Sequence, residues 1–158
     1  MTVRAGSQRA ARLATDLRTA AADLLAVLEE IEPERWSRLP GPGVWSVGKD
    51  AAHVAEATVY HQWIVRLTIG QEVPSRRPPI ERLELTTSMS APEAMDLIRR
   101  RTEDGDALIS SMSDDELTLP TRPPRARGET LAETVKRVLI GHYHGHRRDI
   151  ERKLREQT

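Results

Sequence analysis

The residues of this chain best suited to chemistry are three histidines, His53, His142 and His146. They are three of the five histidines in the chain, and their positions allow two different helices to bring them to one point. Three imidazoles around one point are a ligand set that a divalent transition metal prefers. The sequence therefore predicts a metal site, and it indicates a class of chemistry without naming a substrate.

His142 and His146 lie four residues apart near the middle of the last predicted helix. The same stripe of that helix carries the apolar residues Val135, Leu139 and Ile150. At about 100° per residue these positions share one face, and residues at i and i+4 have Cβ atoms about 5–6 Å apart. Both rings can therefore bind one metal. The pair is not the HExxH motif of zinc proteases, because no glutamate lies between the two histidines.

His53 lies on an earlier predicted helix, on one stripe with Ala57 and Ile64. A single histidine that faces the core is more often a hydrogen-bonded core residue than a ligand, and the spacing permits a meeting with the other two without requiring it. Three such histidines support one another, because burying three imidazoles without partners is costly. We expect His61 to be structural or exposed, and His144 to be exposed or to lie in a dimer contact.

The composition limits the classes of protein to consider. A chain of 158 residues is one domain of ordinary size, residues 1–158. Lys+Arg and Asp+Glu both number 24, and this balance argues against nucleic acid and the membrane surface as partners. The chain has no cysteine, so any thiol chemistry must use the thiol of a small molecule. Neither a signal peptide nor a membrane span is evident, and we expect a cytoplasmic protein.

Four helices must position the histidines, and we expect them at Ser7 to Ile31, Ser46 to Gly70, Ser90 to Met112 and Thr130 to Arg155. Ser46 is a good N-cap, while Ser90 and Thr130 each begin a capping box. Pro33 is expected to mark the end of the first helix. The long segment before Ser90 is expected to be a lid or a crossover. These elements predict an all-α four-helix bundle with a long crossover connection.

Two runs of sequence resemble a known family. Residues 43–54 resemble the start of the second helix in the DinB-like (DinB/YfiT) superfamily, where Trp-Ser precedes a helix with a metal-binding histidine. Residues 141–150 resemble the H-x3-H motif of its last helix. The resemblance implies a four-helix bundle, often a homodimer, with a divalent metal, usually zinc or nickel. Carried over residue by residue, the ligands are His53, His142 and His146, so the resemblance joins His53 to the other two.

The resemblance also implies activities, because members of this family include mycothiol-dependent maleylpyruvate isomerases and bacillithiol transferases. Our leading hypothesis is an S-transferase or isomerase in which a low-molecular-weight thiol, such as mycothiol or bacillithiol, attacks a small electrophilic substrate. A metal-dependent hydrolase and a non-catalytic metal- or ligand-binding dimer are the alternatives. The chain has Arg148-Asp149 where the family often has Gly-Gln, and histidine where some members use a carboxylate ligand. Both departures leave the substrate open.

Three further residues are candidates for a catalytic role. Glu56 and Asp149 each lie about one turn after a predicted ligand and could orient that ligand or act as a base. Tyr60 could donate a hydrogen bond within the pocket. A surface carboxylate or a core tyrosine is the alternative interpretation for each.

Arginines are concentrated in two loops. Arg122, Arg125 and Arg127 could bind the carboxylates of a thiol or substrate, although a solvated charged loop is the alternative interpretation. The same alternatives apply to the loop that carries Arg76, Arg77 and Arg82.

Overall fold

The computed structural model describes residues 6–123 and 127–157, and over these ranges the chain forms helices and no named strand. Three long helices are α1 (Gln8–Glu29), α3 (Val47–Thr68) and α4 (Ala91–Ser110). The fourth consists of three consecutive segments, α6 (Leu131–Thr134), η1 (Val135–Ile140) and α7 (Gly141–Glu156). Two short helices, α2 (Pro33–Trp36) and α5 (Asp114–Thr118), lie in the connections. The all-α four-helix prediction is confirmed.

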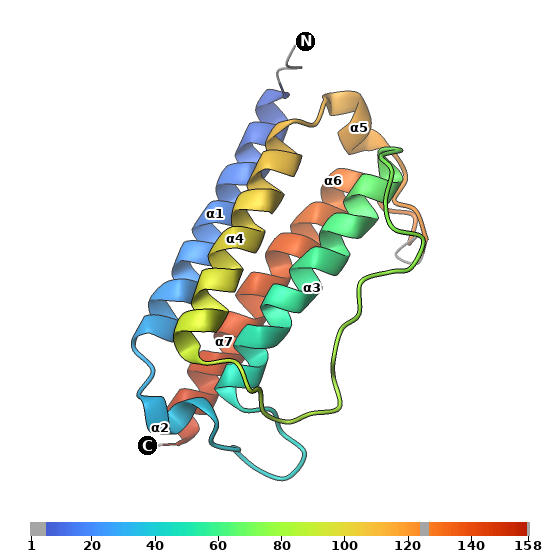
Figure 1. Cartoon of the computed structure of the whole chain (residues 1–158). Coiled ribbons are helices and arrows are strands. Elements are labelled where there is room, and N and C mark those ends of the chain that lie inside the picture. Colours follow the sequence, from blue (N-terminus) through green and yellow to red (C-terminus); the bar gives the residue numbers. More distant parts are fainter. Residues whose placement is uncertain (1–5, 124–126, 158) are drawn as a thin grey trace.

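The four long helices form a bundle in which α1 packs against α4 and α7, and α3 packs against the same two helices (Figure 1). Helix α1 runs down the view of Figure 1, α3 and α4 both run up, and α7 runs down. The parallel pair α3 and α4 is joined by the long segment 69–90, which returns along the length of the bundle. The predicted crossover connection is therefore present.

The helix starts agree with the predicted caps. The side chain of Ser46 accepts a hydrogen bond from the Lys49 amide, and Ser90 and Thr130 both form capping boxes. The end of the first helix differs, because α1 stops at Glu29 and Pro33 begins the short helix α2. Proline is favoured in the first turn of a helix, where its missing N–H has no partner to lose.

The predicted helix from Thr130 to Arg155 is present in extent, but it is not one regular α-helix, because η1 is a π-helical segment in its first half. Bonds from i to i+5 insert one extra residue, which turns the following helix by about 100° relative to a continuous α-helix. Tyr143 consequently faces the centre of the bundle, where its hydroxyl lies 3.2 Å from Thr58 Oγ1 and 3.0 Å from Thr102 Oγ1. His142 and His146 are half-buried at the edge of the core rather than at its centre.

Close packing explains two glycines inside helices. A Cβ at Gly105 of α4 would lie 3.0 Å from Leu17 of α1 and 3.2 Å from Gln62 of α3, so the three helices approach closely at this position. A Cβ at Gly48 would lie 2.7 Å from the ring of Trp36, so α2 packs directly on the first turn of α3. Within the described ranges, no helix has both the length and the apolar character needed to cross a membrane.

Replacing Gly48 by alanine should destabilise the fold. The new Cβ would also lie 2.8 Å from the backbone oxygen of Trp36, and such overpacking costs about 1–3 kcal/mol. Gly145→Ala is the matched control, because no atom lies within 4 Å of its Cβ and alanine favours the helix by about 0.5–1 kcal/mol. Urea denaturation should show opposite signs for the two variants, and equal stability would contradict the packing at Gly48.

Candidate metal centre

Three histidines from α3 and α7 converge where these two helices pack side by side. Ligand nitrogens of His53, His142 and His146 all lie within 4.8 Å of one another, and the Nε2 atoms of His53 and His142 are 3.2 Å apart. A tetrahedral metal with bonds of about 2.0–2.1 Å holds its ligand nitrogens about 3.4 Å apart. The three histidines can therefore hold one divalent metal with small adjustments of their rings.

The π segment explains how α7 presents two of these histidines to α3. Because η1 turns α7 so that Tyr143 points into the core, His142 and His146 point to the side, toward His53. The ring centroids of His53 lie 5.0 Å from those of both His142 and His146. Single π turns inside α-helices are often found at functional sites.

A buried carboxylate orients His146. Its Nδ1 lies 3.0 Å from Oδ1 of Asp50, and because a carboxylate only accepts, Nδ1 must donate. The proton is then fixed on Nδ1, and the lone pair of Nε2 is left for a metal. Metal-binding histidines commonly have such a carboxylate partner, which sets the tautomer and the ring orientation.

Asp50 is itself held by Lys153, whose ammonium group donates to Oδ2. Both side chains are almost completely buried, with exposed fractions of 3% for Asp50 and 6% for Lys153. A buried carboxylate without a cation would be costly, so the lysine makes the charge of Asp50 tolerable in this position. The hydrogen-bonded network of Lys153, Asp50 and His146 thus joins α3 to α7 at two positions along α7.

Burial keeps His53 and His142 in their neutral form. Burial, followed by the neighbouring charges of His146, Arg82 and Lys49, lowers the pKa of His53 to about 4. Burial and the neighbouring histidines lower the pKa of His142 to about 2. Neutral imidazole is the form that binds a metal, so both rings are ready to act as ligands at neutral pH.

Trp45, Asp50 and His61 also belong to this centre, although the sequence did not predict them there and His61 was expected to be structural or exposed. The Trp45 ring lies 4.9 Å from that of His53 and stacks 6.5 Å from that of His146. His61, which is buried, lies 5.1 Å from His142. Helical spacing could have indicated Asp50 and His61, because they are three residues before and eight residues after His53 on one helix.

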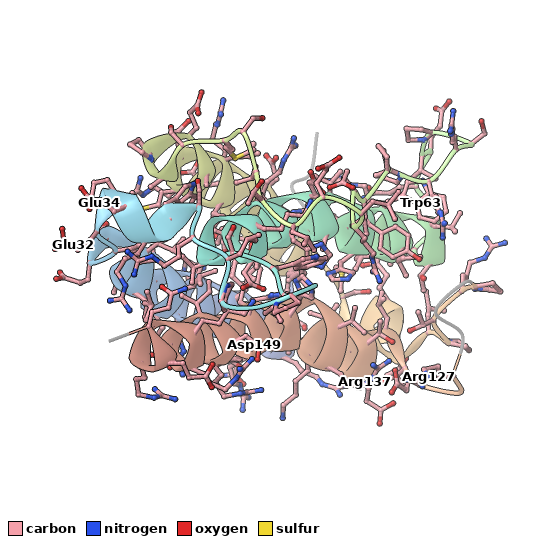
Figure 2. All side chains as sticks on the ribbon, turned by 90° about the horizontal axis from the view of Figure 1, so that it is seen from below. Glu32, Glu34, Trp63, Arg127, Arg137 and Asp149 are labelled. Carbon is pink, nitrogen blue, oxygen red and sulfur yellow. The ribbon has the colours of Figure 1, made fainter. Side chains whose placement is uncertain are left out.

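A groove of about 290 Å³ opens beside the histidines, between α3 and the last helix. Its lining includes His61, Arg137, His142, His146 and Asp149. The cluster can therefore be reached from solvent on this side, as an active site or binding site requires. Figure 2 labels Asp149 and Arg137 along the last helix.

A sequence model of the DinB superfamily matches residues 16–150, which include all three histidines. The chain belongs to the DinB superfamily. In structure it is similar to YfiT from Bacillus subtilis, which is described as a probable metal-dependent hydrolase with an unusual four-helix bundle topology. The two structures have a TM-score of 0.76 and 18% sequence identity, and the match covers 99% of this chain and 93% of YfiT. None of the curated proteins matches this chain.

The structure places the three residues predicted to be catalytic, Glu56, Asp149 and Tyr60, in different surroundings. Glu56 accepts a hydrogen bond from the Glu81 amide and so holds the crossover segment. Asp149 is exposed in the groove, and its carboxylate lies 3.6 Å from Arg152. The carboxylate that contacts His146 is that of Asp50. Tyr60 is buried and lines a different pocket, beside the crossover.

The predicted arginine loop lies at the other end of α3. The Arg122 amide donates to Thr68 Oγ1, and Thr68 is fifteen residues, or about 22 Å of helix, beyond His53. Arg127 is exposed near Glu129, which pairs with Arg137 (Figure 2). Arg125 lies outside the described residues. The structure therefore does not bring Arg122 to the histidines.

We expect the purified protein, after loading with zinc or nickel, to hold about one equivalent of metal by elemental analysis. His53→Ala and His142→Ala should each lose it, because each removes one of only three ligands. His144→Ala is the matched control, since His144 is not part of the cluster. Retention of metal in both ligand variants would contradict the assignment.

The double variant Asp50→Asn/Lys153→Met should weaken metal binding about 10–100-fold, because it removes the carboxylate that orients His146. Both charges are removed together, so that neither is left buried without a partner. Competition with a chromophoric chelator measures the change. Asp149→Asn should bind as tightly as the wild type, and an equal loss in that control would show that Asp50 has no special role.

Proposed function

We propose that this protein is a metal-dependent enzyme in which zinc or nickel, held by His53, His142 and His146, activates a small nucleophile. The observation that supports this most strongly is the ligand set, which consists of three imidazoles and no carboxylate. When bound, a divalent metal with three neutral ligands keeps its full positive charge and acidifies a thiol or water at its remaining position.

The residues around the ligands have separate tasks in this proposal. Asp50 holds His146 in the tautomer that can bind. Trp45 covers the cluster on one side and limits access of water there. His61 lies beside His142 and borders the groove, where an imidazole can take up the proton that the nucleophile releases. The nucleophile and its substrate enter from the groove.

A low-molecular-weight thiol, such as mycothiol or bacillithiol, is our first candidate for the nucleophile. The chain has no cysteine of its own, and Arg82, whose charge acts on His53, can pair with a carboxylate of such a molecule. The thiol would lose its proton, and its sulfur would form a bond to an electrophilic carbon of the substrate. Depending on the substrate, a leaving group departs or the adduct isomerises and releases the thiol.

Water is the second candidate, and the reaction would then be hydrolysis. The likeness to YfiT, described as a probable metal-dependent hydrolase, favours this alternative. The exposed carboxylate of Asp149 in the groove could accept a proton from the attacking water. The requirement for a thiol separates the two reactions.

The test is turnover by the metal-loaded protein with and without added thiol. We expect conjugation of monochlorobimane with a thiol to exceed the uncatalysed rate, and His142→Ala to lose that excess because it lacks the metal. Turnover of p-nitrophenyl acetate without thiol, lost in the same variant, would instead identify a hydrolase. Absence of both activities would contradict an enzymatic role and leave a metal-binding protein.

A further inference from the structure

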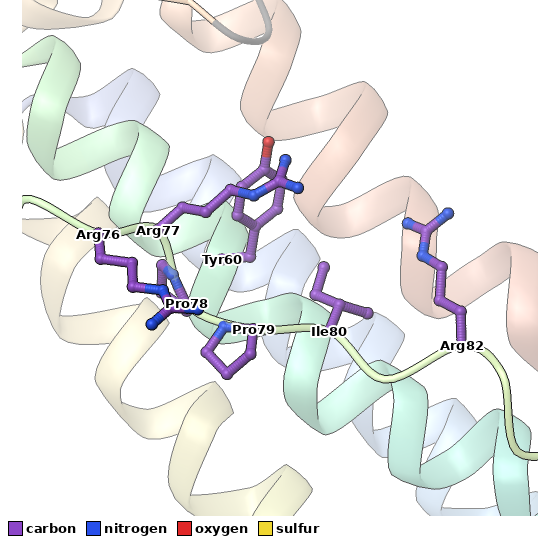
Figure 3. Close-up of a pocket in the computed structure, with 7 residues that line it drawn as sticks. All are labelled: Tyr60, Arg76, Arg77, Pro78, Pro79, Ile80 and Arg82. Carbon is purple, nitrogen blue, oxygen red and sulfur yellow. The ribbon is translucent and has the colours of Figure 1, made fainter.

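A second cavity, of about 560 Å³, lies between α3 and the crossover segment 69–90, which we call the strap. One of its lining residues, Tyr60, comes from α3, and the others come from the strap: Arg76, Arg77, Pro78, Pro79, Ile80 and Arg82 (Figure 3). We call this cavity the strap pocket. It is distinct from the groove that His142 and His146 line.

The strap is fixed to α3 along its length, so the strap pocket has a defined shape. Trp63 Nε1 donates to the Pro74 carbonyl over 3.0 Å, and the Glu81 amide donates to Glu56 Oε2 over 3.1 Å. Glu81 also forms an ion pair with the buried Lys49. Pro78 and Pro79, between these anchors, restrict the backbone further.

The strap pocket brings together three arginines that form no ion pair within the described structure. Arg76, Arg77 and Arg82 form no ion pair or hydrogen bond with any residue in the ranges 6–123 and 127–157. None of the residues that line the pocket is acidic. The chain as a whole has a formal net charge of zero, so three unpaired guanidinium groups around one cavity are a local property of this site.

The arrangement of the arginines connects this cavity to the metal centre. Arg77 extends over Tyr60, while Arg82 extends toward α7, as Figure 3 shows. The charge of Arg82 acts on both His53 and His142. Tyr60 lies seven residues after His53 on the same helix, a distance of about 10 Å. An extended molecule of that length can therefore reach from the histidines to Arg77.

We propose that the strap pocket binds a small molecule with two or more carboxylate or phosphate groups, which Arg76, Arg77 and Arg82 recognise. Planar guanidinium groups bind such oxyanions through paired hydrogen bonds. The role of this ligand in catalysis rests on the proposed metal-dependent activity. In that activity the strap pocket selects a polyanionic thiol or substrate and holds its reactive end at the histidines.

The test is calorimetric titration of the full-length, metal-free protein with two probes, propane-tricarboxylate and pyrophosphate. Without metal, neither probe can bind by chelation. We expect saturable binding of at least one probe, and the one that binds identifies carboxylate or phosphate as the preferred group. The double variant Arg76→Gln/Arg77→Gln should weaken binding at least about tenfold, because it removes at least one charge-assisted hydrogen bond to the probe. Arg82→Gln should weaken it as well.

Arg9→Gln/Arg12→Gln is the matched control, because it removes the same charge from exposed positions on α1. It should bind as the wild type does. No saturable binding of either probe, or an equal loss in the control, would overturn the proposal. Because the titration uses metal-free protein, its result is independent of turnover: an inactive enzyme could still bind the probes, and an active one could fail to bind them.

Discussion

The buried carboxylate of Asp50 is the contact on which the geometry of the histidine cluster depends, because it binds two residues of α7 at once. His146 and Lys153 are seven residues, or about two turns, apart on that helix. Contacts at two levels of α7 fix both its height and its rotation relative to α3. A shift by one turn would move α7 by about 5.4 Å and separate His142 from His53.

Two local features make this contact possible. The π segment η1 turns α7 so that Tyr143 enters the core and bonds to hydroxyls of α3 and α4, which leaves His142 and His146 facing α3. At the other side, α2 packs on Gly48 and sets the position of the first turn of α3, the turn that includes Asp50. Packing around the histidines therefore acts together with the Asp50 contact to place them.

The topology of the bundle creates the strap. Helices α3 and α4 are parallel neighbours, so the chain must return along the 22 residues of α3, about 33 Å, before α4 begins. A connection of that length has to lie on some surface of the bundle, and here it lies on α3, held by Trp63, Glu56 and Lys49. Its arginines thereby come to lie beside the helix that carries His53, although they follow His53 by more than twenty residues in the sequence.

The sequence by itself determined the helices, because caps, apolar periodicity and loop residues act locally. Ser46, Ser90 and Thr130 cap helices as predicted, and the spacing of His142 and His146 already placed both on one side of a helix.

The meeting of His142 and His146 with His53 could be predicted only from the family resemblance, because spacing contains no information on how two helices pack. The π segment was missed for the same reason, since nothing local in its sequence marks a π turn and packing in the core selects the extra residue. Only the tertiary structure decided which charged residues surround the histidines. It placed Asp50 there instead of Glu56 or Asp149, and it placed Arg82 there instead of Arg122, because contacts between distant segments depend on topology and burial.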